Sequence, residues 1–375
     1  MKASVWLVGT GLVFGAFTGV RDRAAAQSAA ITEFGRAADS IVAADGLGRG
    51  IPGIGVAVVA RGQIILARGY GVSDRTRGLR VSDSSPFNIA SVTKPFTAIV
   101  ALRLARRGVV SLGATPLGRW LPWVPEPYRA VTLQHLLSHT SGVVRDVRRS
   151  NDDDPDPVEY RHRVERSQPS FAAGSRFEYS NTGYTLLGWA LEAAAGRGLD
   201  SLLANEIFKP LGMTTATYRA APTGRRARPY AVTSDGSVRD TAWLTGGFGS
   251  GGIALSARDA ARFAQGLQRG LVLTQDEQRV AWAPASLGDG SPIRARAVTD
   301  DDSYGLGWWI SSHQGHRLLS HGGGITGYSA FLWHFPDRQL TIFVVANAKA
   351  RDDGQAPVDA IIRALADLCR ANPAC

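Results

Sequence analysis

The stretch Phe87-Asn-Ile-Ala-Ser-Val-Thr-Lys-Pro-Phe-Thr-Ala98 is the part of the chain that says most about its fold. Within it, Ser91 and Lys94 are three residues apart, so they lie on one face if the segment is helical. Pro95 has no N–H group and is tolerated only in the first turn of a helix. Ser91 is therefore predicted at or just before the start of a helix over 91–107, where the helix dipole stabilises developing negative charge.

The Ser91 and Lys94 pair has a simple chemical interpretation. A serine hydroxyl is a poor nucleophile until a nearby base takes its proton. A lysine amine can be that base only if it is held neutral, which burial or a neighbouring cation favours. We therefore predict Ser91 as a nucleophile and Lys94 as its base. The chain has no Gly-x-Ser-x-Gly elbow and no His-Glu-x-x-His motif, which argues against the α/β-hydrolase and zinc-protease alternatives.

A second segment, Tyr179-Ser-Asn181, contains the only one of the nine tyrosines that has asparagine two residues later. Tyr179 is predicted to relay a proton beside Lys94, because a neighbouring cation lowers the pKa of a phenol. The amide of Asn181 can orient a lysine and a substrate carbonyl. The alternative is an ordinary boundary between a loop and a helix, where asparagine is a common cap.

A third segment, His321-Gly-Gly-Gly324, is expected just after a strand over 317–320. Three glycines let another backbone or a ligand approach closely and leave N–H groups free to donate. Such donors are what an oxyanion hole requires. The alternative is a glycine-rich bulge or turn.

In this order, Ser-x-x-Lys, Tyr-x-Asn and a glycine-rich strand resemble the serine β-lactamase and penicillin-binding-protein superfamily. The chain is most similar to its class C β-lactamase-like group, which includes DD-peptidases and esterases. The resemblance extends over roughly residues 35–365, and its supporting stretches are His135-Leu-Leu-Ser-His-Thr-Ser-Gly142, Phe208-Lys-Pro-Leu-Gly-Met213 and Gly251-Gly-Ile-Ala-Leu-Ser-Ala-Arg-Asp259.

The resemblance implies an acyl-serine mechanism that needs no metal or organic cofactor. Ser91 would attack the carbonyl, while Lys94 and Tyr179 would share the proton transfers. Asn181 would position the substrate and the lysine. The N–H groups of Ser91 and Gly324 would bind the oxyanion, and water would then release the acyl group.

The chain departs from the β-lactamase pattern at the third segment. His321-Gly322-Gly323 stands where β-lactamases usually carry Lys-Thr-Gly, whose lysine and hydroxyl hold the substrate carboxylate. A histidine is charged only in part near neutrality, and glycine has no hydroxyl. This favours an esterase or a peptidase over an efficient β-lactamase. A second reading is a module of the same fold that binds penicillins or cell-wall fragments without efficient turnover.

The order of elements predicts an α+β fold: an antiparallel β-sheet flanked by N- and C-terminal helices, with an inserted, mostly helical lobe. The α/β lobe is placed at about residues 27–110 and 255–370, and the helical lobe at about 111–254. The expected strands are 53–60, 63–69, 304–310, 317–320, 328–335 and 340–346. The other expected helices are 31–45, 133–137, 181–195, 200–207, 256–268 and 358–369.

The first 26 residues have the pattern of a signal peptide, with a basic start, an apolar stretch and a cleavage site after Ala26. The mature catalytic domain would then be residues 27–375, secreted or periplasmic. The alternative is an uncleaved anchor, but four glycines weaken a spanning helix, so no stable membrane span is expected. The only cysteines, Cys369 and Cys375, could close one small loop in an oxidising compartment.

The chain has a net charge of +10, yet only four of its 42 basic residues are lysines. The arginines are scattered among acidic residues, which argues against a nucleic-acid partner. The expected partners are a small-molecule or peptide-like acyl substrate and, through its charge, the cell wall. The polar stretch 145–169 is interpreted as an exposed loop, with a cation site as the alternative, and His135 and His139 are expected to be structural rather than metal ligands.

Overall fold

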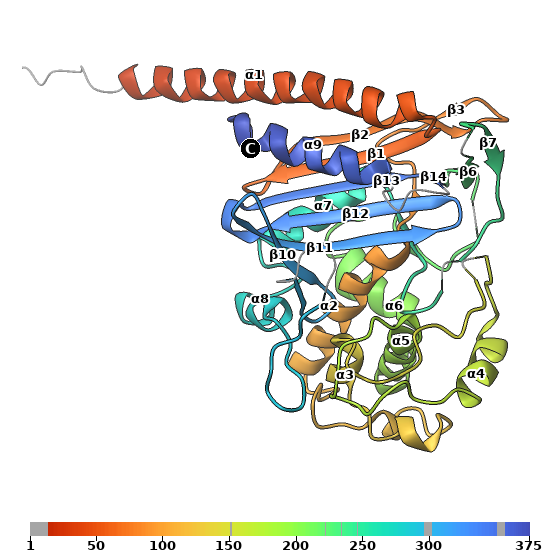
Figure 1. Cartoon of the computed structure of the whole chain (residues 1–375). Helices are drawn as coiled ribbons and strands as arrows, with labels where there is room; N and C mark the ends of the chain where they lie inside the picture. The colour runs from red at the N-terminus through yellow and green to blue at the C-terminus, as the bar shows by residue number, and fades with distance from the viewer. Residues whose placement is uncertain are drawn as a thin grey trace, which may run out of the picture.

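The computed structural model describes residues 14–150, 152–221, 223–233, 235–245, 247–295, 302–350 and 357–375. Its centre is one eight-stranded antiparallel sheet (Figure 1). In spatial order its strands are β3 (Leu79–Arg80), β2 (Gln63–Asp74), β1 (Gly53–Ala60), β13 (Leu340–Ala346), β12 (Tyr328–Phe335), β11 (His316–Ile325), β10 (Trp309–His313) and β9 (Ser303–Tyr304). The α+β class and the antiparallel sheet are confirmed.

The middle of the sheet is buried on both faces because its strands are mostly apolar. Every residue of β1 and of β13 is buried. Alternate residues of a strand point to opposite faces. Accordingly, Val56 and Val58 belong to a core cluster on one face, while Ala57 and Val59 belong to a cluster on the other.

Helices cover the two faces of this sheet. The first face packs against α1 (Phe14–Asp45) and α9 (Pro357–Ala371), the terminal helices, which lie side by side across the top in Figure 1. Phe34, Ala38 and Val42 of α1 are four residues apart and buried, so they form the stripe that faces the sheet. The second face packs against α7 (Ala257–Gln268).

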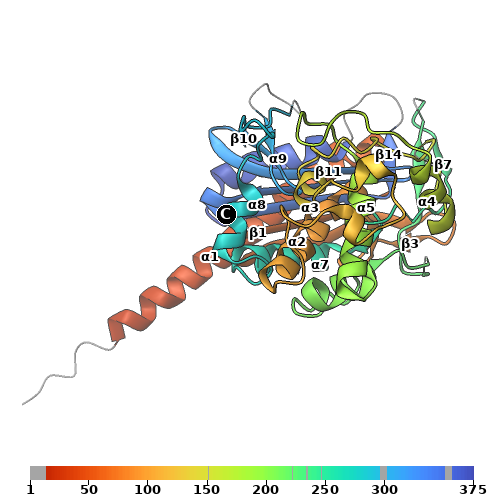
Figure 2. The ribbon, with the colours of Figure 1, turned by 90° about the horizontal axis from the view of Figure 1, so that it is seen from below.

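The remaining helices lie below the sheet in Figure 1, and Figure 2 shows them from that side. They are α2 (Thr93–Arg106), α3 (Leu133–Leu137), α4 (Pro157–Glu165), α5 (Asn181–Ala195), α6 (Leu199–Leu203) with a π-helical turn at Ala204–Phe208, and α8 (Gln275–Trp282). Two small sheets join them: β4 (Phe87–Asn88), β8 (Ile253–Leu255) and β5 (Thr217–Tyr218); and β14 (Ala348–Ala350), β6 (Tyr230–Val232) and β7 (Val238–Asp240). The predicted lobe boundaries stay a prediction.

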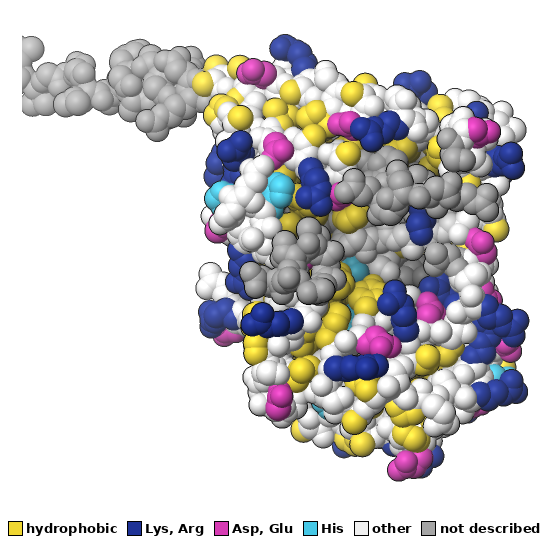
Figure 3. All heavy atoms as spheres, viewed as in Figure 1, with side chains coloured by type: hydrophobic (Ala, Val, Ile, Leu, Met, Phe, Trp, Pro, Cys, Tyr) yellow, Lys and Arg dark blue, Asp and Glu magenta, His cyan; other side chains and the backbone are white. Residues whose placement is uncertain are grey.

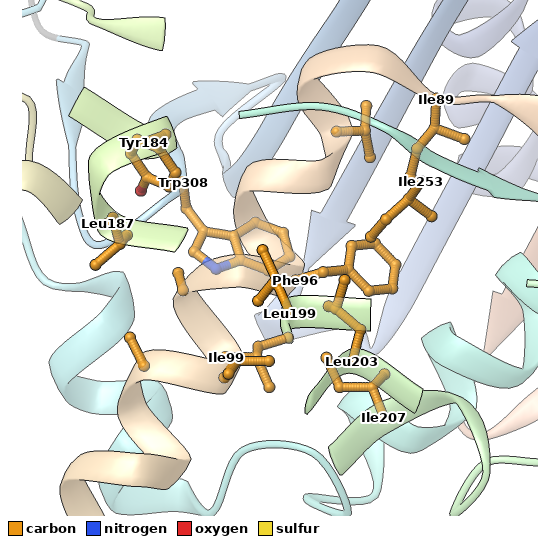
Figure 4. Packing of buried hydrophobic residues seen from close by; sticks show 14 of the residues in the cluster. Ile89, Phe96, Ile99, Tyr184, Leu187, Leu199, Leu203, Ile207, Ile253 and Trp308 are labelled. Carbon is orange, nitrogen blue, oxygen red and sulfur yellow. The ribbon is translucent and has the colours of Figure 1, made fainter. Parts of the chain in front are cut away.

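Helix α2 passes through the centre of the largest apolar core. Its residues from Thr93 to Leu102 are all buried. Figure 4 shows Phe96 of α2 packed close to Ile253 and Leu203, and its ring stacks on Phe263 with centroids 4.2 Å apart. The helix that carries the candidate lysine is therefore held on all sides.

Three of the expected strands differ from the structure. The strand expected at 63–69 continues to Asp74 as β2. The segment 304–310 is not one strand, because it is interrupted between β9 and β10, where Gly307 has a φ of +86°. The strand expected at 317–320 is longer and runs from His316 to Ile325 as β11, so the three glycines lie inside a strand rather than after one. Pairing with β12 extends this strand, because backbone hydrogen bonds do not need side chains.

The interpretation of residues 145–169 as an exposed loop was wrong. The stretch contains α4, and Asp156 caps that helix through the N–H groups of Val158 and Glu159. Asp154 accepts hydrogen bonds from the N–H group and the hydroxyl of Thr245, at 2.7 and 2.8 Å. The acidic residues of this stretch therefore serve internal contacts. Among the residues that the structure describes, no cluster of histidine, cysteine or carboxylate groups could hold a metal ion.

The two ends of the chain concern the expected signal peptide and the expected disulfide. Residues 1–13 of the expected signal peptide lie outside the described residues, and from Phe14 the backbone is one continuous helix as far as Asp45. None of the helices described is both long and apolar enough to pass through a membrane. Cys369 and Cys375 form a disulfide with Cα atoms 5.2 Å apart.

Replacing Phe96 with alanine is expected to destabilise the protein by about 3–5 kcal/mol, because it removes a buried ring and leaves a cavity. The urea midpoint followed by tryptophan fluorescence measures this change. Leu271→Ala is the control, since Leu271 is 57% exposed and its loss should change stability by about 0.5 kcal/mol or less. Equal midpoints for the two variants would contradict the assignment of Phe96 to the core.

Candidate active site

Ser91 lies in a short 3-10 helix, Ala90–Val92, that leads directly into α2. This confirms its predicted place at the start of a helix. Ala90 has a φ of +46°, a left-handed conformation that is rare for a residue with a side chain, and its N–H group donates to Asn88 Oδ1 at 2.8 Å. The chain thus turns sharply just before Ser91, and the Ser91 N–H group lies in a first turn that offers it no intrahelical acceptor.

Lys94 is fully buried, and its Nζ atom touches three oxygens. These are Ser91 Oγ at 3.1 Å, Asn181 Oδ1 at 2.8 Å and the Ser250 carbonyl at 3.0 Å. Burial lowers the pKa of Lys94 well below its ordinary value; the nearby Arg148 lowers it further, and Asp146 opposes them. The lysine is therefore poised to be a neutral amine.

The three contacts of Lys94 determine which partner each N–H group of a neutral amine would face and which partner its lone pair would face. Such an amine has two N–H donors and one lone pair. The Asn181 and Ser250 oxygens can only accept, so each takes one N–H. The lone pair is then left for the hydroxyl of Ser91, which is the one partner able to donate. This arrangement lets Lys94 remove the Ser91 proton.

Tyr179 lies beside the same pair of residues. Lys94 Nζ is 4.7 Å from the centre of its ring. Burial raises the pKa of Tyr179 above its ordinary value, and a hydrogen bond with the Ser91 side chain only partly offsets this effect. The nearby cations Arg145 and Arg148 do lower this pKa, as a cation was predicted to do, but burial outweighs them and the net shift is upward. Tyr179 is thus a neutral phenol that can donate or relay a proton.

An aromatic cage that no sequence motif indicates surrounds this centre. The His139 ring lies 4.3 Å from Tyr179, 4.9 Å from Tyr184 and 4.8 Å from Tyr304, measured between ring centres. His139 Nδ1 accepts a hydrogen bond from the Ser180 N–H group, and His135 Nδ1 accepts one from Thr132. These contacts confirm structural roles for both histidines. Tyr184 and Tyr304 are isolated in the sequence and gave no signal.

The glycine-rich half of β11 lies against Ser91. Residues 316–320 of β11 pair with β10, whereas 321–325 continue past the end of β10. A Cβ atom at Gly323 would lie 2.2 Å from the Ile89 carbonyl oxygen and 3.1 Å from the Ser91 nitrogen. The strand can approach the serine this closely only because position 323 has no side chain.

His321 is buried at the same edge of β11. Burial lowers its pKa to about 3, so its ring is neutral at physiological pH rather than partly charged. Its Nδ1 atom is 2.7 Å from the Gly322 carbonyl oxygen and must donate to it. Its Nε2 atom is then an acceptor, 3.3 Å from the Tyr304 hydroxyl. His321 therefore offers no positive charge to a substrate.

Asn181 is the first residue of α5 and lies next to a pair of charged residues that the sequence analysis missed. Its Nδ2 group donates to Asp146 Oδ2 at 2.8 Å, and Arg148 holds the same carboxylate with a contact of 2.8 Å. Both belong to the stretch interpreted as an exposed loop. The one available signal was its Asp-x-Arg spacing, which is too common to be informative.

These residues open onto a cleft of about 990 Å³, which Ser91, Tyr179 and His321 line. Aromatic side chains form much of its wall: Phe177, Trp309, Phe331 and Trp333. Charged side chains of both signs also line it: Arg145, Arg294, Arg363, Glu178, Asp302 and Asp359. In Figure 3 hydrophobic side chains gather near the centre of this face, with basic side chains around them. Three of the predicted site residues, Ser91, Tyr179 and His321, line this cleft. Lys94 contacts Ser91 and Asn181, Gly323 lies against the Ser91 turn, and Gly324 follows it in β11. The roles of all seven stay predictions.

Comparison with known proteins agrees with this geometry. Residues 30–366 match the family described as Beta-lactamase. Penicillin-binding protein 4* of Bacillus subtilis is 28% identical over 323 residues, which cover 76% of this chain and 66% of the relative. Esterase EstB of Burkholderia gladioli is 36% identical over 197 residues, which cover 47% of this chain and 49% of the relative. The chain thus spans about half to two thirds of the length of these relatives.

Solved structures show the same fold. The D-amino acid amidase of Ochrobactrum anthropi has a TM-score of 0.76 at 24% identity, over 89% of this chain and 99% of its own. The octameric penicillin-binding protein homologue of Pyrococcus abyssi has a TM-score of 0.77 at 23% identity, over 90% of this chain and 77% of its own. Because the family match extends over most of the sequence, the chain belongs to the beta-lactamase family.

Proposed function

We propose that this protein is a secreted serine hydrolase that cleaves an ester or amide carbonyl through an acyl-enzyme on Ser91. The observation that carries the proposal is the environment of Lys94, whose buried amine contacts the Ser91 hydroxyl at 3.1 Å. Its other two contacts are acceptors, so its lone pair is directed at the serine proton. A neutral amine in this position supplies the base that an unassisted serine lacks.

The proposed reaction has two halves. Ser91 Oγ bonds to the carbonyl carbon as its proton moves to Lys94, and the resulting oxyanion accepts hydrogen bonds from the N–H groups of Ser91 and Gly324. The bond to the alcohol or amine then breaks as that group takes a proton from Tyr179, which Lys94 replaces. In the second half, water bonds to the acyl carbon as it loses a proton to Lys94. The bond from this carbon to Ser91 Oγ then breaks as Lys94 returns the proton to Oγ, which releases the acid and restores Ser91.

The residues of the segment His321–Gly324 favour an uncharged acyl group close to the reacting carbonyl. His321 is neutral, and Gly322 has no hydroxyl to bind a carboxylate there. The aromatic wall of the cleft suits an apolar ester or amide. Relatives of this fold include an esterase and a D-amino acid amidase. We place ester or small amide cleavage ahead of β-lactam hydrolysis.

The proposed location is outside the cytoplasm. The pattern of the first 26 residues supports export, and the disulfide between Cys369 and Cys375 suits an oxidising compartment. Removal of residues 1–26 would take away Lys2, Arg21, Arg23 and Asp22 and change the net charge from +10 to +8. This basic protein would then encounter the anionic cell wall as a partner.

Fluorophosphonate is expected to add covalently to Ser91, and Ser91→Ala is expected to lose both this adduct and the hydrolysis of p-nitrophenyl esters. Intact-protein mass spectrometry and absorbance measure the two effects, with nitrocefin as the β-lactam comparison. Unchanged turnover by Ser91→Ala would refute the mechanism. A penicillin adduct that persists for hours, without ester turnover, would instead indicate a binding module.

The pH dependence of ester hydrolysis tests the role of Lys94. The value of kcat/KM should fall as the pH decreases through the pKa of Lys94, because the protonated amine has no lone pair. Burial lowers this pKa, so the loss belongs on the acid side and activity should persist at neutral pH. Lys94→Arg should lose about 100-fold or more, since a guanidinium stays protonated. Lys209→Arg, which changes an exposed lysine, should behave as wild type, and a similar loss there would contradict the assignment.

Gly323→Ala tests the contact between β11 and the serine turn. The new Cβ atom would overlap the Ile89 carbonyl, so the strand and the Ser91 turn must separate. A misplacement of about 1 Å can cost about 100-fold in rate, so fluorophosphonate labelling should slow by a comparable factor. Gly35→Ala, whose new atom would lie 3.6 Å from its nearest neighbour, is the control. Equal labelling rates in the two variants would show that the contact is unimportant.

A further inference from the structure

Asp146 and Arg148 form an ion pair beside Asn181 that the mechanism described above does not use. Arg148 approaches both carboxylate oxygens of Asp146 through Nε at 3.2 Å and one of them through Nη2 at 2.8 Å. The Asp146 side chain is 21% exposed and that of Arg148 only 11%. Asp146 in turn accepts a hydrogen bond of 2.8 Å from the Asn181 amide.

This hydrogen bond determines which end of the Asn181 amide faces Lys94. An ionised carboxylate can only accept, so the NH₂ end of the amide must point at Asp146 and its oxygen at Lys94. In the flipped amide, an oxygen would face the carboxylate and an N–H group would donate to the lone pair of Lys94. That lone pair would then be unavailable to Ser91. The orientation of one amide therefore decides whether the amine can act as a base.

The backbone around Asp146 is bound firmly to the start of α5. The segment 144–147 and the residues 180–182 exchange three hydrogen bonds of 2.8–3.0 Å, which are Asn181 N–H to the Arg145 carbonyl, Ser180 Oγ to the Val144 carbonyl and Val147 N–H to Thr182 Oγ1. The carboxylate is thus presented to Asn181 by a fixed segment.

The pair also supplies the full charges that act on Lys94. Burial lowers the pKa of this lysine first, then Arg148 lowers it, and Asp146 raises it. The other titratable groups facing the amine are neutral, because burial lowers the pKa of each histidine and raises that of each tyrosine; they are His139, His321, Tyr179 and Tyr184. Arg145, which lines the cleft, acts on Tyr179. A lone Asp146 would favour the protonated lysine, so Arg148 offsets that effect.

We propose that Asp146 and Arg148 are positioning residues: Asp146 orients the Asn181 amide so that the lone pair of Lys94 stays directed at Ser91, and Arg148 balances the charge of Asp146. The inference rests on the proposed function, in which Lys94 is the base. Neither residue touches the reacting atoms. Their effect is on the geometry and on the protonation of the amine that does.

The experiment measures kcat/KM for a p-nitrophenyl ester against pH in two variants that are expected to shift the pKa of Lys94 in opposite directions. Arg148→Gln leaves the charge of Asp146 unbalanced. The acid limb of the profile, where kcat/KM falls as the pH decreases, should therefore move to higher pH. At a given pH on that limb, kcat/KM should be lower by roughly threefold or more. Asp146→Asn removes the negative charge and the orientation of the amide. Its acid limb should move to lower pH while its plateau falls, by up to about 100-fold.

Two controls separate this effect from a general loss of structure. Arg148→Lys keeps the charge and should leave the acid limb at its wild-type position. Arg258→Gln removes another bidentate ion pair, the one with Asp83, and should leave the whole profile unchanged. Thermal unfolding of each variant verifies folding.

The inference is overturned if folded Arg148→Gln and Asp146→Asn keep the wild-type acid limb, or if both limbs move in the same direction. This result is distinct from failure of the proposed function. If fluorophosphonate does not label Ser91 of the wild-type protein, the hydrolase proposal itself fails. If Ser91 is labelled and the limbs do not move, only the role of the ion pair is refuted.

Discussion

The arrangement of the site depends on keeping one amine out of water. Lys94 is fully buried beneath the aromatic cage, and its three contacts come from three separate parts of the chain: the turn at Ser91, the first residue of α5 and the loop before β8. An ammonium group in that position would carry a large desolvation cost, so burial favours the neutral form. The apolar packing of α2 therefore has a chemical consequence, because the same core that stabilises the helix adjusts the protonation of its lysine.

The neighbours of the amine show a common electrostatic design. Two histidines and two tyrosines line its surroundings, and burial keeps them all uncharged. Against this neutral background a single ion pair, Asp146 with Arg148, has an influence that it would not have at a solvated surface. Because His321 is neutral, this edge of β11 offers no full positive charge to a substrate carboxylate, which a lysine at that position would supply.

Local pattern was sufficient to predict several elements, and long-range packing explains the failures. The helix at Asn181–Ala195 and the strands at Tyr328–Phe335 and Leu340–Ala346 have the predicted bounds, because caps, turns and alternation are encoded within a few residues. The extension of β11 through its glycines depends on the partner strand β12, which lies elsewhere in the sequence. Likewise, the pKa of Tyr179 depends on burial by segments that the motif does not include. Asp146 had no informative local signal, since it contacts Asn181 of α5, which lies elsewhere in the sequence.

The close approach of Gly323 to the turn at Ser91 joins parts of the chain that are synthesised far apart in time. A nascent chain that ends before α5 already contains the serine and the lysine, but it lacks Asn181, the Ser250 carbonyl and the covering strand. Its amine would be an ordinary solvated cation and its hydroxyl would be inert. In the proposed mechanism the activated serine would therefore require the complete tertiary structure, and a fragment or folding intermediate would lack it.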